Sequence, residues 1–387
     1  MHRLKNIHNI NEMRSGARSR LPRLVFDYLE GGAEDEHNLS DNITSFDHWK
    51  FKPRRLTDLT TVDTSTHILG SPASFPGVMA PTGLNSLFWP NGDIALAKAA
   101  ARVGIPFVLS TASSDSLEAV AEQVDGEHWF QLYVIEKSLA QSLVRRARDL
   151  EYRKLVITTD VVVNGKRERD LRNGFGLPIR YNLKTILDGL THPAWALDFL
   201  KNGTPQLGNL ADRDALSPEA RAALLSRSMD AGFTWDDVAR IRDLWPGQII
   251  LKGLLHQDDL DKCQRYGIEG VVLSNHGGRQ LDTTVSTIDA LASLDTRNLN
   301  ADVLIDGGIR RGRDIAKACA LGANATLIGR AALYGLAAGG EEGAFKALSI
   351  LKDEFEGCMS QLGCSTVSEL EGNLVENSNQ QATIQED

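Results

Sequence analysis

The chain has 387 residues, of which 42% are hydrophobic and 24% are charged, as is usual for a globular protein. Its 42 lysines and arginines against 51 aspartates and glutamates give a formal net charge of −9. Nucleic acid is therefore an unfavourable partner, because binding phosphates requires a basic surface. No uninterrupted apolar run of about 18 residues is present to span a bilayer, and the N-terminus lacks the apolar core of a signal peptide.

The four cysteines form no C-x-x-C pair, so we expect neither a metal site nor disulfides, and a reducing cytoplasm is the expected location. Residues 1–75 precede the first candidate strand, and we expect them to form a helical extension that packs on the main domain. Within it, the segment PRLVFDYLEGG begins with Pro22 and ends at Gly31 and Gly32, which is typical of a short helix.

Short apolar segments alternate with helix-like segments along the rest of the chain. The strand-like segments are residues 77–83, 106–112, 129–134, 154–162, 248–255, 270–277, 302–308 and 325–330. Most are rich in Val, Ile and Leu without alternation, which indicates parallel strands covered on both faces. Amphipathic segments such as 92–104, 138–152 and 312–323 lie between them. Eight such units in order predict an α/β fold, a (β/α)8 TIM barrel over residues 76–356.

An open, doubly wound sheet is the alternative fold. Eight strands are many for that fold, however, and no G-x-G-x-x-G turn follows an early strand. The gap between the fourth and fifth strands, residues 165–245, is several times the usual length and predicts an insertion in addition to the fourth helix. Residues 357–387 predict a C-terminal segment, and its polar end, residues 376–387, is expected to be disordered.

Polar residues gather where the predicted strands end, which is where barrels of this kind carry their catalytic groups. They are Thr82, Ser110, Gln131, Tyr133, Thr158, Asp160, Lys252, Ser274, His276, Arg279, Asp306 and Arg330. Each has an ordinary structural explanation by itself. Because an unpartnered buried polar group costs about 1–3 kcal/mol, the whole set indicates a bound ligand.

The last two strands end in DGGIRRG (306–312) and GR (329–330). Barrels commonly hold a phosphate between these two loops and a helix N-terminus. Gly307 and Gly308 allow the backbone to approach a ligand, and Arg310 or Arg330 can add a charge-assisted hydrogen bond. The alternative is that the two glycines only make a tight turn.

Lys252 has two chemical interpretations, a Schiff-base nucleophile as in aldolases or a charged group that stabilises an anion on a cofactor. A lysine that only reaches solvent from the barrel rim is the structural alternative. His276 and Asp160 predict an acid–base pair, since imidazole titrates near neutrality and a carboxylate orients it. Arg279 and Arg167 can hold a carboxylate bidentately, although Arg167 lies in the run NGKRERD, where a solvated charge cluster is the alternative.

Six motifs resemble those of the FMN-dependent 2-hydroxy acid dehydrogenases and oxidases. They are APTGL (80–84), FQLY (130–133), TTD (158–160), LKG (251–253), SNHGGRQLD (274–282) and DGGIRRG (306–312). The resemblance extends from about Leu21 to Leu370, and the His-Gly-Gly-Arg motif is highly specific. That family has a (β/α)8 barrel, which agrees with the strand count, and its cofactor is FMN.

The resemblance implies a role for each matching residue. For catalysis and substrate binding it implies His276 as the base, Asp160 as its partner, Arg279 and Arg167 on the substrate carboxylate, Tyr28 and Tyr133 on substrate oxygens, and Lys252 beside the flavin. For FMN binding it implies Pro81, Thr82, Gly83, Ser110, Gln131, Thr158, Lys252, Ser274, Asp306, Gly307, Gly308, Arg310, Gly329 and Arg330. The implied reaction oxidises an (S)-2-hydroxy acid to the 2-keto acid, by hydride transfer or by abstraction of the α-proton, and the sequence leaves both routes open.

Within the family, the chain resembles most the enzymes that act on mandelate-like substrates. Ala112 leaves room for an aryl group at a position where glycolate oxidases carry Trp, and Gly83 also matches that branch. Oxidation of L-lactate, or oxidation with oxygen as the acceptor, is the alternative within the family. A Schiff-base aldolase on the same barrel is the alternative from a different class.

Residues 177–215 resemble a segment that attaches enzymes of this branch to the inner face of the cell membrane. The segment contains Leu177, Ile179, Leu187, Trp195, Leu197, Phe199 and Leu200, with Arg180, Lys184 and Lys201. Apolar residues flanked by cations suit interfacial contact, whereas packing on the barrel or on another subunit is the alternative. A membrane-associated dehydrogenase would pass electrons to quinone, which is the acceptor that we expect. We also expect a homotetrameric cytoplasmic enzyme that is peripheral on the membrane.

Overall fold

The computed structural model describes residues 2–175, 183–210, 229–372 and 375–377, and its centre is a closed barrel of eight parallel strands. Around the barrel the strands follow the order β10-β11-β4-β5-β6-β7-β8-β9. Their bounds are β4 (Gly77–Met79), β5 (Phe107–Ser110), β6 (His128–Leu132), β7 (Lys154–Thr158), β8 (Gln248–Leu254), β9 (Gly270–Leu273), β10 (Asp302–Ile305) and β11 (Ala325–Ile328). The predicted (β/α)8 barrel is confirmed.

All eight predicted strands extend beyond the C-terminal end of the corresponding observed strand. The segment predicted at 270–277 ends as a strand at Leu273, and the one predicted at 302–308 ends at Ile305. The backbone explains both differences, since His276 has a φ of 58° and Gly307 and Gly308 both have a φ of 83°. These left-handed conformations do not fit a strand. The polar residues that we assigned to strand ends therefore lie largely in loops above the barrel.

The barrel strands are buried on both faces, which accounts for their continuous apolar sequences. In β7, Val156 joins the cluster inside the barrel, while Leu155 and Ile157 join the layer between strands and helices. A two-stranded hairpin, β2 (Thr66–Ile68) and β3 (Ser71–Ala73), contributes Ile68 and Leu69 to the interior cluster. This hairpin closes the end of the barrel opposite to the polar loops.

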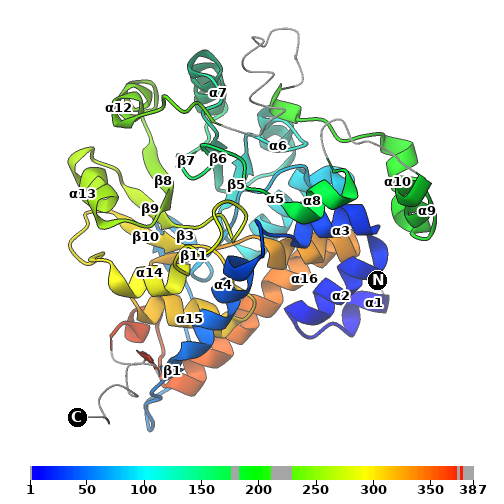
Figure 1. Ribbon diagram of the computed structural model, residues 1–387. Coiled ribbons are helices and arrows are strands. Elements are labelled where there is room, and N and C mark those ends of the chain that lie inside the picture. Colours follow the sequence, from blue (N-terminus) through cyan, green and yellow to red (C-terminus); the bar gives the residue numbers. More distant parts are fainter. Residues whose placement is uncertain (1, 176–182, 211–228, 373–374, 378–387) are drawn as a thin grey trace.

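Helices surround the barrel (Figure 1). Those that follow the strands are α5 (Gly92–Val103), α6 (Leu117–Gln123), α7 (Lys137–Asp149), α12 (Trp235–Leu244), α13 (Gln257–Arg265), α14 (Thr287–Ser293), α15 (Gly312–Ala320) and α16 (Arg330–Leu362). In α16 the helix is interrupted at Gly339 and Gly340, whose backbone is not helical. This helix continues across residue 356, where we placed the end of the barrel domain, so the domain limits stay predictions.

The N-terminal extension is helical and packs on the barrel. It contains α1 (His2–Lys5), α2 (Ile10–Arg20), α3 (Arg23–Glu30) and α4 (His37–His48), followed by β1 (Trp49–Phe51). Pro22 and Gly31 flank α3, as the sequence predicted. Figure 1 shows α2 beside α16, with which it makes many contacts. The end of α3 brings Tyr28 to the open end of the barrel.

The insertion between β7 and α12 contains α8 (Glu168–Asn173), α9 (Leu183–Leu190), α10 (Pro193–Asn202) and the short 3-10 helix η2 (Gly208–Leu210). Figure 1 shows α9 and α10 at the edge of the molecule, beside the N-terminal helices. The predictions for Leu177, Ile179 and Arg180, and the one for the side chain of Lys184, lie outside what the structure describes. Among the described residues, no helix combines the length and the apolar character needed to cross a bilayer.

The C-terminal segment contains the 3-10 helix η4 (Val367–Leu370) and the strand β12 (Val375–Asn377). We predicted disorder from residue 376, but residues 376 and 377 pair antiparallel with β1. Backbone pairing with β1 orders these two residues, although their polar side chains by themselves predict disorder. The rest of that prediction, residues 378–387, lies outside the described residues.

Candidate active site

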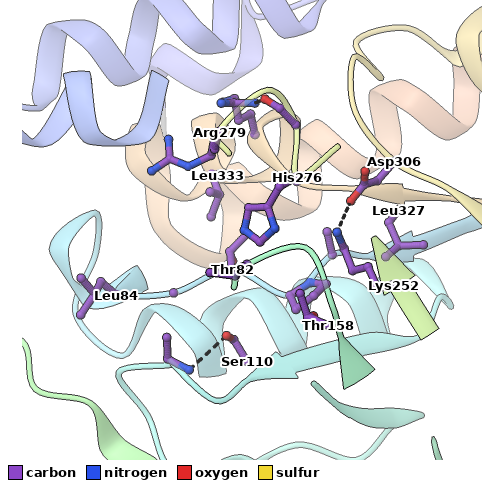
Figure 2. A pocket seen from close by; sticks show the side chains of 18 of the residues that line it. Thr82, Leu84, Ser110, Thr158, Lys252, His276, Arg279, Asp306, Leu327 and Leu333 are labelled. Carbon is purple, nitrogen blue, oxygen red and sulfur yellow. Dashed lines mark hydrogen bonds and ion pairs between the residues drawn. The ribbon is translucent and has the colours of Figure 1, made fainter. Parts of the chain in front are cut away.

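A cavity of about 240 Å³ opens at the C-terminal ends of the barrel strands, and side chains from several strands and loops converge on it (Figure 2). The predicted site residues that line it are Tyr28, Pro81, Thr82, Gly83, Ser110, Tyr133, Thr158, Arg167, Lys252, His276, Arg279, Asp306, Gly307, Gly308, Arg310, Gly329 and Arg330. The other three, Gln131, Asp160 and Ser274, lie behind the lining and hold residues that form it.

His276 is held at both its backbone and its ring. Its backbone N–H donates to Ser274 Oγ at 3.0 Å, and its Nδ1 lies 2.9 Å from Asp160 Oδ1. These two contacts fix the imidazole with Nε2 on the cavity side, 3.4 Å from the hydroxyl oxygen of Tyr133. The predicted pairing of His276 with Asp160 is present in the structure, although the residues are 116 positions apart.

The ionisation of this pair leaves His276 able to accept a proton. Burial lowers the pKa of His276 below its ordinary value, although the charge of Asp160 acts in the opposite direction. For Asp160, burial acts to raise the pKa, but the charge and hydrogen bond of His276 and the charge of Lys252 outweigh it, so the pKa is lowered. A neutral imidazole beside an ionised carboxylate donates its Nδ1–H to Asp160. Its Nε2 lone pair then faces the cavity.

The two predicted clamp arginines both line the cavity. Nη1 of Arg279 donates to the carbonyls of Tyr28 (2.9 Å) and Gly31 (2.7 Å), and the guanidinium carbon lies 5.3 Å from the centre of the Tyr28 ring. Within the described part of the chain, Nε and Nη2 of Arg279 have no partner. Arg167 donates from Nε to the carbonyl of Arg279 at 3.3 Å. The solvated charge cluster that we considered for Arg167 is therefore wrong, because its side chain is partly buried at the cavity.

Lys252 is buried and charged. Its Nζ lies 2.7 Å from Ser274 Oγ and 2.7 Å from Asp306 Oδ2. Burial acts to lower the pKa of Lys252, but the charges of Asp306 and Asp160 outweigh it, so the pKa is raised. A lysine that keeps its proton at neutral pH is a poor Schiff-base nucleophile and a good partner for an anion. Figure 2 shows the Lys252–Asp306 pair on one side of His276 and Arg279 on the other.

The end of the cavity formed by the loops after β10 and β11 has the features of a phosphate site. Gly307 and Gly308 bring the backbone to the cavity, and Gly329 and Arg330 lie at the N-terminus of α16, whose backbone N–H groups favour an anion. Burial, followed by the charges of Arg279 and Arg310, lowers the pKa of Arg330 to about 9. A bound phosphate would relieve this concentration of positive charge.

Arg330 also has a structural task that the sequence did not predict. Its guanidinium donates to the carbonyls of Leu29 (3.2 Å), Gly31 (2.9 Å) and Gly277 (2.8 Å). These bonds tie the N-terminal extension to the loop that carries His276. Among the described residues, the guanidinium of Arg310 donates a hydrogen bond only to the neighbouring carbonyl of Ile309, so this side chain is the more available one for an anion.

A row of buried amide and hydroxyl groups lies between the two ends of the cavity. Ser110 Oγ donates to Gln131 Oε1 at 2.9 Å, and Gln131 Nε2 donates to Thr158 Oγ1 at 3.0 Å. On the neighbouring wall, a Cβ built on Gly83 would lie 3.0 Å from the Cβ of Ala112. The backbone of Gly83 and the small side chain of Ala112 are thus in contact.

These residues fit FMN. The described structure contains a carboxylate oxygen, Asp306 Oδ1, that is buried and has no hydrogen-bond partner. The same cavity joins an anion-binding end, a buried cation at Lys252 and a row of polar groups that could meet the polar edge of a flavin. Each predicted FMN-binding residue lies in this cavity or directly behind it.

Apart from Pro81 and Ala112, sequence reasoning missed most of the apolar lining. Ile135 and Val161 come shortly after β6 and β7, so extending the strand-end rule to apolar residues would have found them. Leu207, Leu210 and Met229 come from the long insertion and carry no such signal. The buried side chain of Asn209 fixes the turn between the two leucines, because its Nδ2 donates to Ser110 O (3.1 Å) and Ser113 Oγ (2.9 Å).

Comparison with protein families matches residues 17–377 to the family described as FMN-dependent dehydrogenase. The (S)-mandelate dehydrogenase of Pseudomonas putida is 49% identical over 373 residues, which cover 96% of this chain and 95% of that protein. A putative L-lactate dehydrogenase of Mycobacterium tuberculosis is 40% identical over 93% of this chain and 87% of its own length. An L-lactate oxidase of Nostoc sp. is 38% identical over 94% of this chain and 96% of its own length.

Solved structures give the same result. The crystal structure of the monotopic membrane protein (S)-mandelate dehydrogenase superposes with a TM-score of 0.92 at 49% identity, covering 96% of this chain and all of that one (100%). A crystal structure of mandelate oxidase gives a TM-score of 0.81 at 35% identity, covering 96% and 98% of the two chains. The chain belongs to the FMN-dependent dehydrogenases, in the branch of enzymes that act on 2-hydroxy acids, and its cofactor is FMN.

Proposed function

We propose that this enzyme oxidises an aryl-substituted (S)-2-hydroxy acid, of which mandelate is the model, to the corresponding 2-keto acid. The observation that carries the proposal is the convergence on one cavity of a neutral His276 and of the edge of Arg279 that has no partner among the described residues. A 2-hydroxy acid needs a base for its proton and a planar cation for its carboxylate, and these two residues supply both.

Each residue of the cluster then has a separate task. Arg279 and Arg167 bind the carboxylate, and this fixes the α-carbon relative to His276. His276 Nε2 takes a proton from the substrate, and Asp160 stabilises the imidazolium that forms. Burial raises the pKa of Tyr133, so its hydroxyl stays protonated and donates a hydrogen bond to a substrate oxygen.

Bound FMN supplies the two-electron acceptor for this oxidation. Lys252 stays positively charged in the cavity, where it stabilises negative charge that develops next to it. Its contacts with Asp306 and Ser274 fix the ammonium group in place before the reaction. We assign the remaining FMN contacts to the residues at the phosphate end and to the row formed by Ser110, Gln131 and Thr158.

The apolar lining favours an aryl substituent over a methyl group. Ala112, Ile135, Leu207, Leu210 and Met229 line part of the cavity with apolar side chains that carry no ring. The names of two relatives point in the same direction, since (S)-mandelate dehydrogenase and mandelate oxidase both have an aryl substrate. Lactate is the second candidate substrate, because L-lactate dehydrogenases and an L-lactate oxidase are also similar to this chain.

An anaerobic substrate screen tests this proposal. Mandelate, lactate, glycolate and longer 2-hydroxy acids are each mixed with the FMN-loaded enzyme, and bleaching of the flavin absorption is followed. Mandelate should bleach the flavin fastest, and Ala112→Trp should reverse the preference in favour of glycolate. Faster flavin reduction by lactate than by mandelate in the wild-type enzyme would contradict the aryl assignment. Reoxidation of the reduced enzyme by a quinone analogue and by air then identifies the acceptor, for which we propose quinone.

We also propose that the insertion attaches the enzyme peripherally to the cytoplasmic face of a membrane. On α9 and α10, the exposed leucines recur at helical spacing at Leu183, Leu187, Leu190, Leu197 and Leu200, and each is at least 63% exposed. The opposite side of the hairpin is anchored, because Trp195 Nε1 donates to Leu87 O at 2.8 Å and Asp198 pairs with Arg20. The anchored side supports packing on the barrel, and the exposed leucines support contact with a membrane.

Sedimentation with vesicles that contain anionic lipid tests the membrane proposal. Leu187→Asp combined with Leu197→Asp should move the protein from the vesicle pellet to the supernatant and leave turnover unchanged. Leu171→Asp is the matched control, because Leu171 on α8 is 65% exposed but lies outside the leucine stripe. Equal sedimentation of the double variant and wild type would contradict the proposal.

For the oligomeric state we propose a homotetramer. Val163 and Leu281 are 74% and 67% exposed, and Gln280 brings them close together by donating to the carbonyl of Val163. We assign this exposed apolar pair to the surface that another subunit covers. Light scattering of the detergent-solubilised enzyme measures the mass, and a monomer at micromolar concentration would contradict the tetramer.

A further inference from the structure

We propose that Gln280 is a positioning residue that sets the base and the carboxylate clamp at a fixed distance from each other. This inference rests on the proposed function, since it concerns the same substrate. The four residues of the base and clamp come from two loops. The loop after β7 carries Asp160 and Arg167, and the loop after β9 carries His276 and Arg279.

The side chain of Gln280 joins these two loops through both ends of its amide. Its Nε2 donates to the carbonyls of Asp160 (3.2 Å) and Val163 (2.9 Å). Its Oε1 accepts from Arg167 Nη2 (3.1 Å) and from the backbone N–H of Gly165 (3.4 Å). One neutral amide thus makes two kinds of contact. It binds the backbone of Asp160, the residue that orients His276, and it binds the guanidinium of Arg167 in the clamp.

The loops approach each other so closely that Gln280 has little freedom to move. A Cβ built on Gly165 would lie 2.3 Å from the carbonyl oxygen of Arg279 and 2.5 Å from that of Gln280, so this approach requires glycine. Arg167 Nε donates to the same Arg279 carbonyl at 3.3 Å. The hydrogen bonds of Gln280 therefore fix the position of the loop after β9 relative to the loop after β7.

Glutamine is the residue type that this position needs. The loop after β7 presents two carbonyl acceptors on one side and two N–H donors on the other, and only an amide satisfies both without a charge. A carboxylate would still accept from Arg167, but it would repel the two carbonyls and compete with the substrate for the charge of Arg167. An apolar side chain of similar length would leave all four groups without this partner.

Two variants separate these effects. Gln280→Met keeps the side-chain length and loses all four hydrogen bonds, so we expect kcat/KM to fall about 10²-fold, with kcat and KM both affected, because the base and clamp lose their relative placement. Gln280→Glu keeps the contact with Arg167, so its larger effect should be on substrate affinity. That affinity is also measured without turnover, as the Kd of an unreactive arylacetate that perturbs the flavin spectrum, and we expect it to weaken about tenfold in both variants.

Gln257→Met is the matched control. Gln257 also bridges two segments through its amide, from Asp295 N–H to Asp261 Oδ1, but it lies outside the cavity. The control should keep wild-type kcat, KM and Kd per bound FMN. If Gln280→Met also keeps them, or loses activity only in proportion to lost FMN or folded protein, the positioning role is wrong.

The proposed substrate and this inference fail in different ways. If wild-type enzyme is reduced by another 2-hydroxy acid and not by mandelate, the aryl assignment is wrong. The kcat/KM of Gln280→Met is then compared with that of wild type using that acid as the substrate. Equal kcat/KM values for Gln280→Met and wild type, together with an unchanged Kd for arylacetate, overturn the inference whichever acid is the substrate.

Discussion

The two ends of the barrel each bury a lysine in nearly the same polar setting, but only one of these lysines faces a cavity. Lys252, near the C-terminal end of β8, contacts Asp306 and Ser274. Lys154, at the start of β7, contacts Glu127 Oε1 at 2.7 Å and Ser71 Oγ at 2.5 Å. Both lysines are less than 5% exposed.

The difference lies in what covers each lysine. The β2–β3 hairpin supplies Ser71 and closes the barrel over Lys154, whose Nζ also lies 5.1 Å from the centre of the Trp129 ring. At the other end, Lys252 and Asp306 line the cavity, and Asp306 keeps an unpartnered oxygen. A buried lysine–carboxylate pair is therefore not by itself a functional signal. Its position at the C-terminal ends of the strands, where loops leave a space, makes it one.

The largest expected effect of a single change belongs to His276 at the open end. We expect His276→Ala to slow flavin reduction by substrate about 10²- to 10⁴-fold, because the variant lacks the imidazole that accepts the proton, while FMN stays bound. Stopped-flow absorbance measures the reduction. The matched change at the closed end is His128→Ala, since His128 begins β6 and contacts Val124 O. Flavin reduction at the wild-type rate in the His276→Ala variant would refute the role of His276 as the base.

Arg279→Lys tests the clamp at the same end. We expect kcat/KM to fall about 10- to 100-fold, because a point ammonium cannot replace the two-pronged contact of a guanidinium with a carboxylate. Arg242→Lys is a suitable control, as Arg242 pairs with Glu269 outside the cavity. Steady-state kinetics on both variants measure the effect, and equal parameters for Arg279→Lys and wild type would count against the clamp.

The two lysines themselves give the most direct test of the comparison. Lys252→Met should lower the rate of flavin reduction and weaken binding of sulfite to the flavin, because a cation is lost from the cavity. Lys154→Met should leave the reduction rate per bound FMN unchanged and lower the free energy of unfolding by about 1–3 kcal/mol, since Glu127 loses its partner. Urea unfolding and rapid-mixing spectroscopy measure the two effects. If Lys154→Met slows flavin reduction and Lys252→Met changes only the free energy of unfolding, the functional end and the structural end of the barrel have been assigned wrongly.

The smallest expected effect is a shift in pH dependence. The base must be neutral, so kcat/KM should fall as the pH falls through the pKa of His276, which lies below its ordinary value of 6.5. Asp160 attracts a proton to His276, so Asp160→Asn should lower that pKa further and move the acidic limb to lower pH. The plateau should also fall, because the imidazolium loses its stabilising charge. An acidic limb that moves to higher pH in this variant would contradict the assigned direction.

The sequence by itself determined the barrel and most of its polar site. Strand starts such as Gly77, Lys154 and Gly270 were predicted at the residues where the structure begins them, because the strands are buried on both faces and their apolar runs are unbroken. Parallel strands bring their C-terminal ends to one rim, so residues at those ends, such as Lys252 and His276, could be assigned to one site without coordinates.

Only the tertiary structure decided which of these residues touch and what covers them. The contacts of Arg330 with the N-terminal extension, and of Gln280 with the loop after β7, depend on how far each loop leaves its strand. Leu207 and Met229 reach the cavity from an insertion whose path no local pattern predicts. The physical reason is that strand and helix patterns are repeated over neighbouring residues, whereas contacts between loops depend on single side chains brought together by the whole fold.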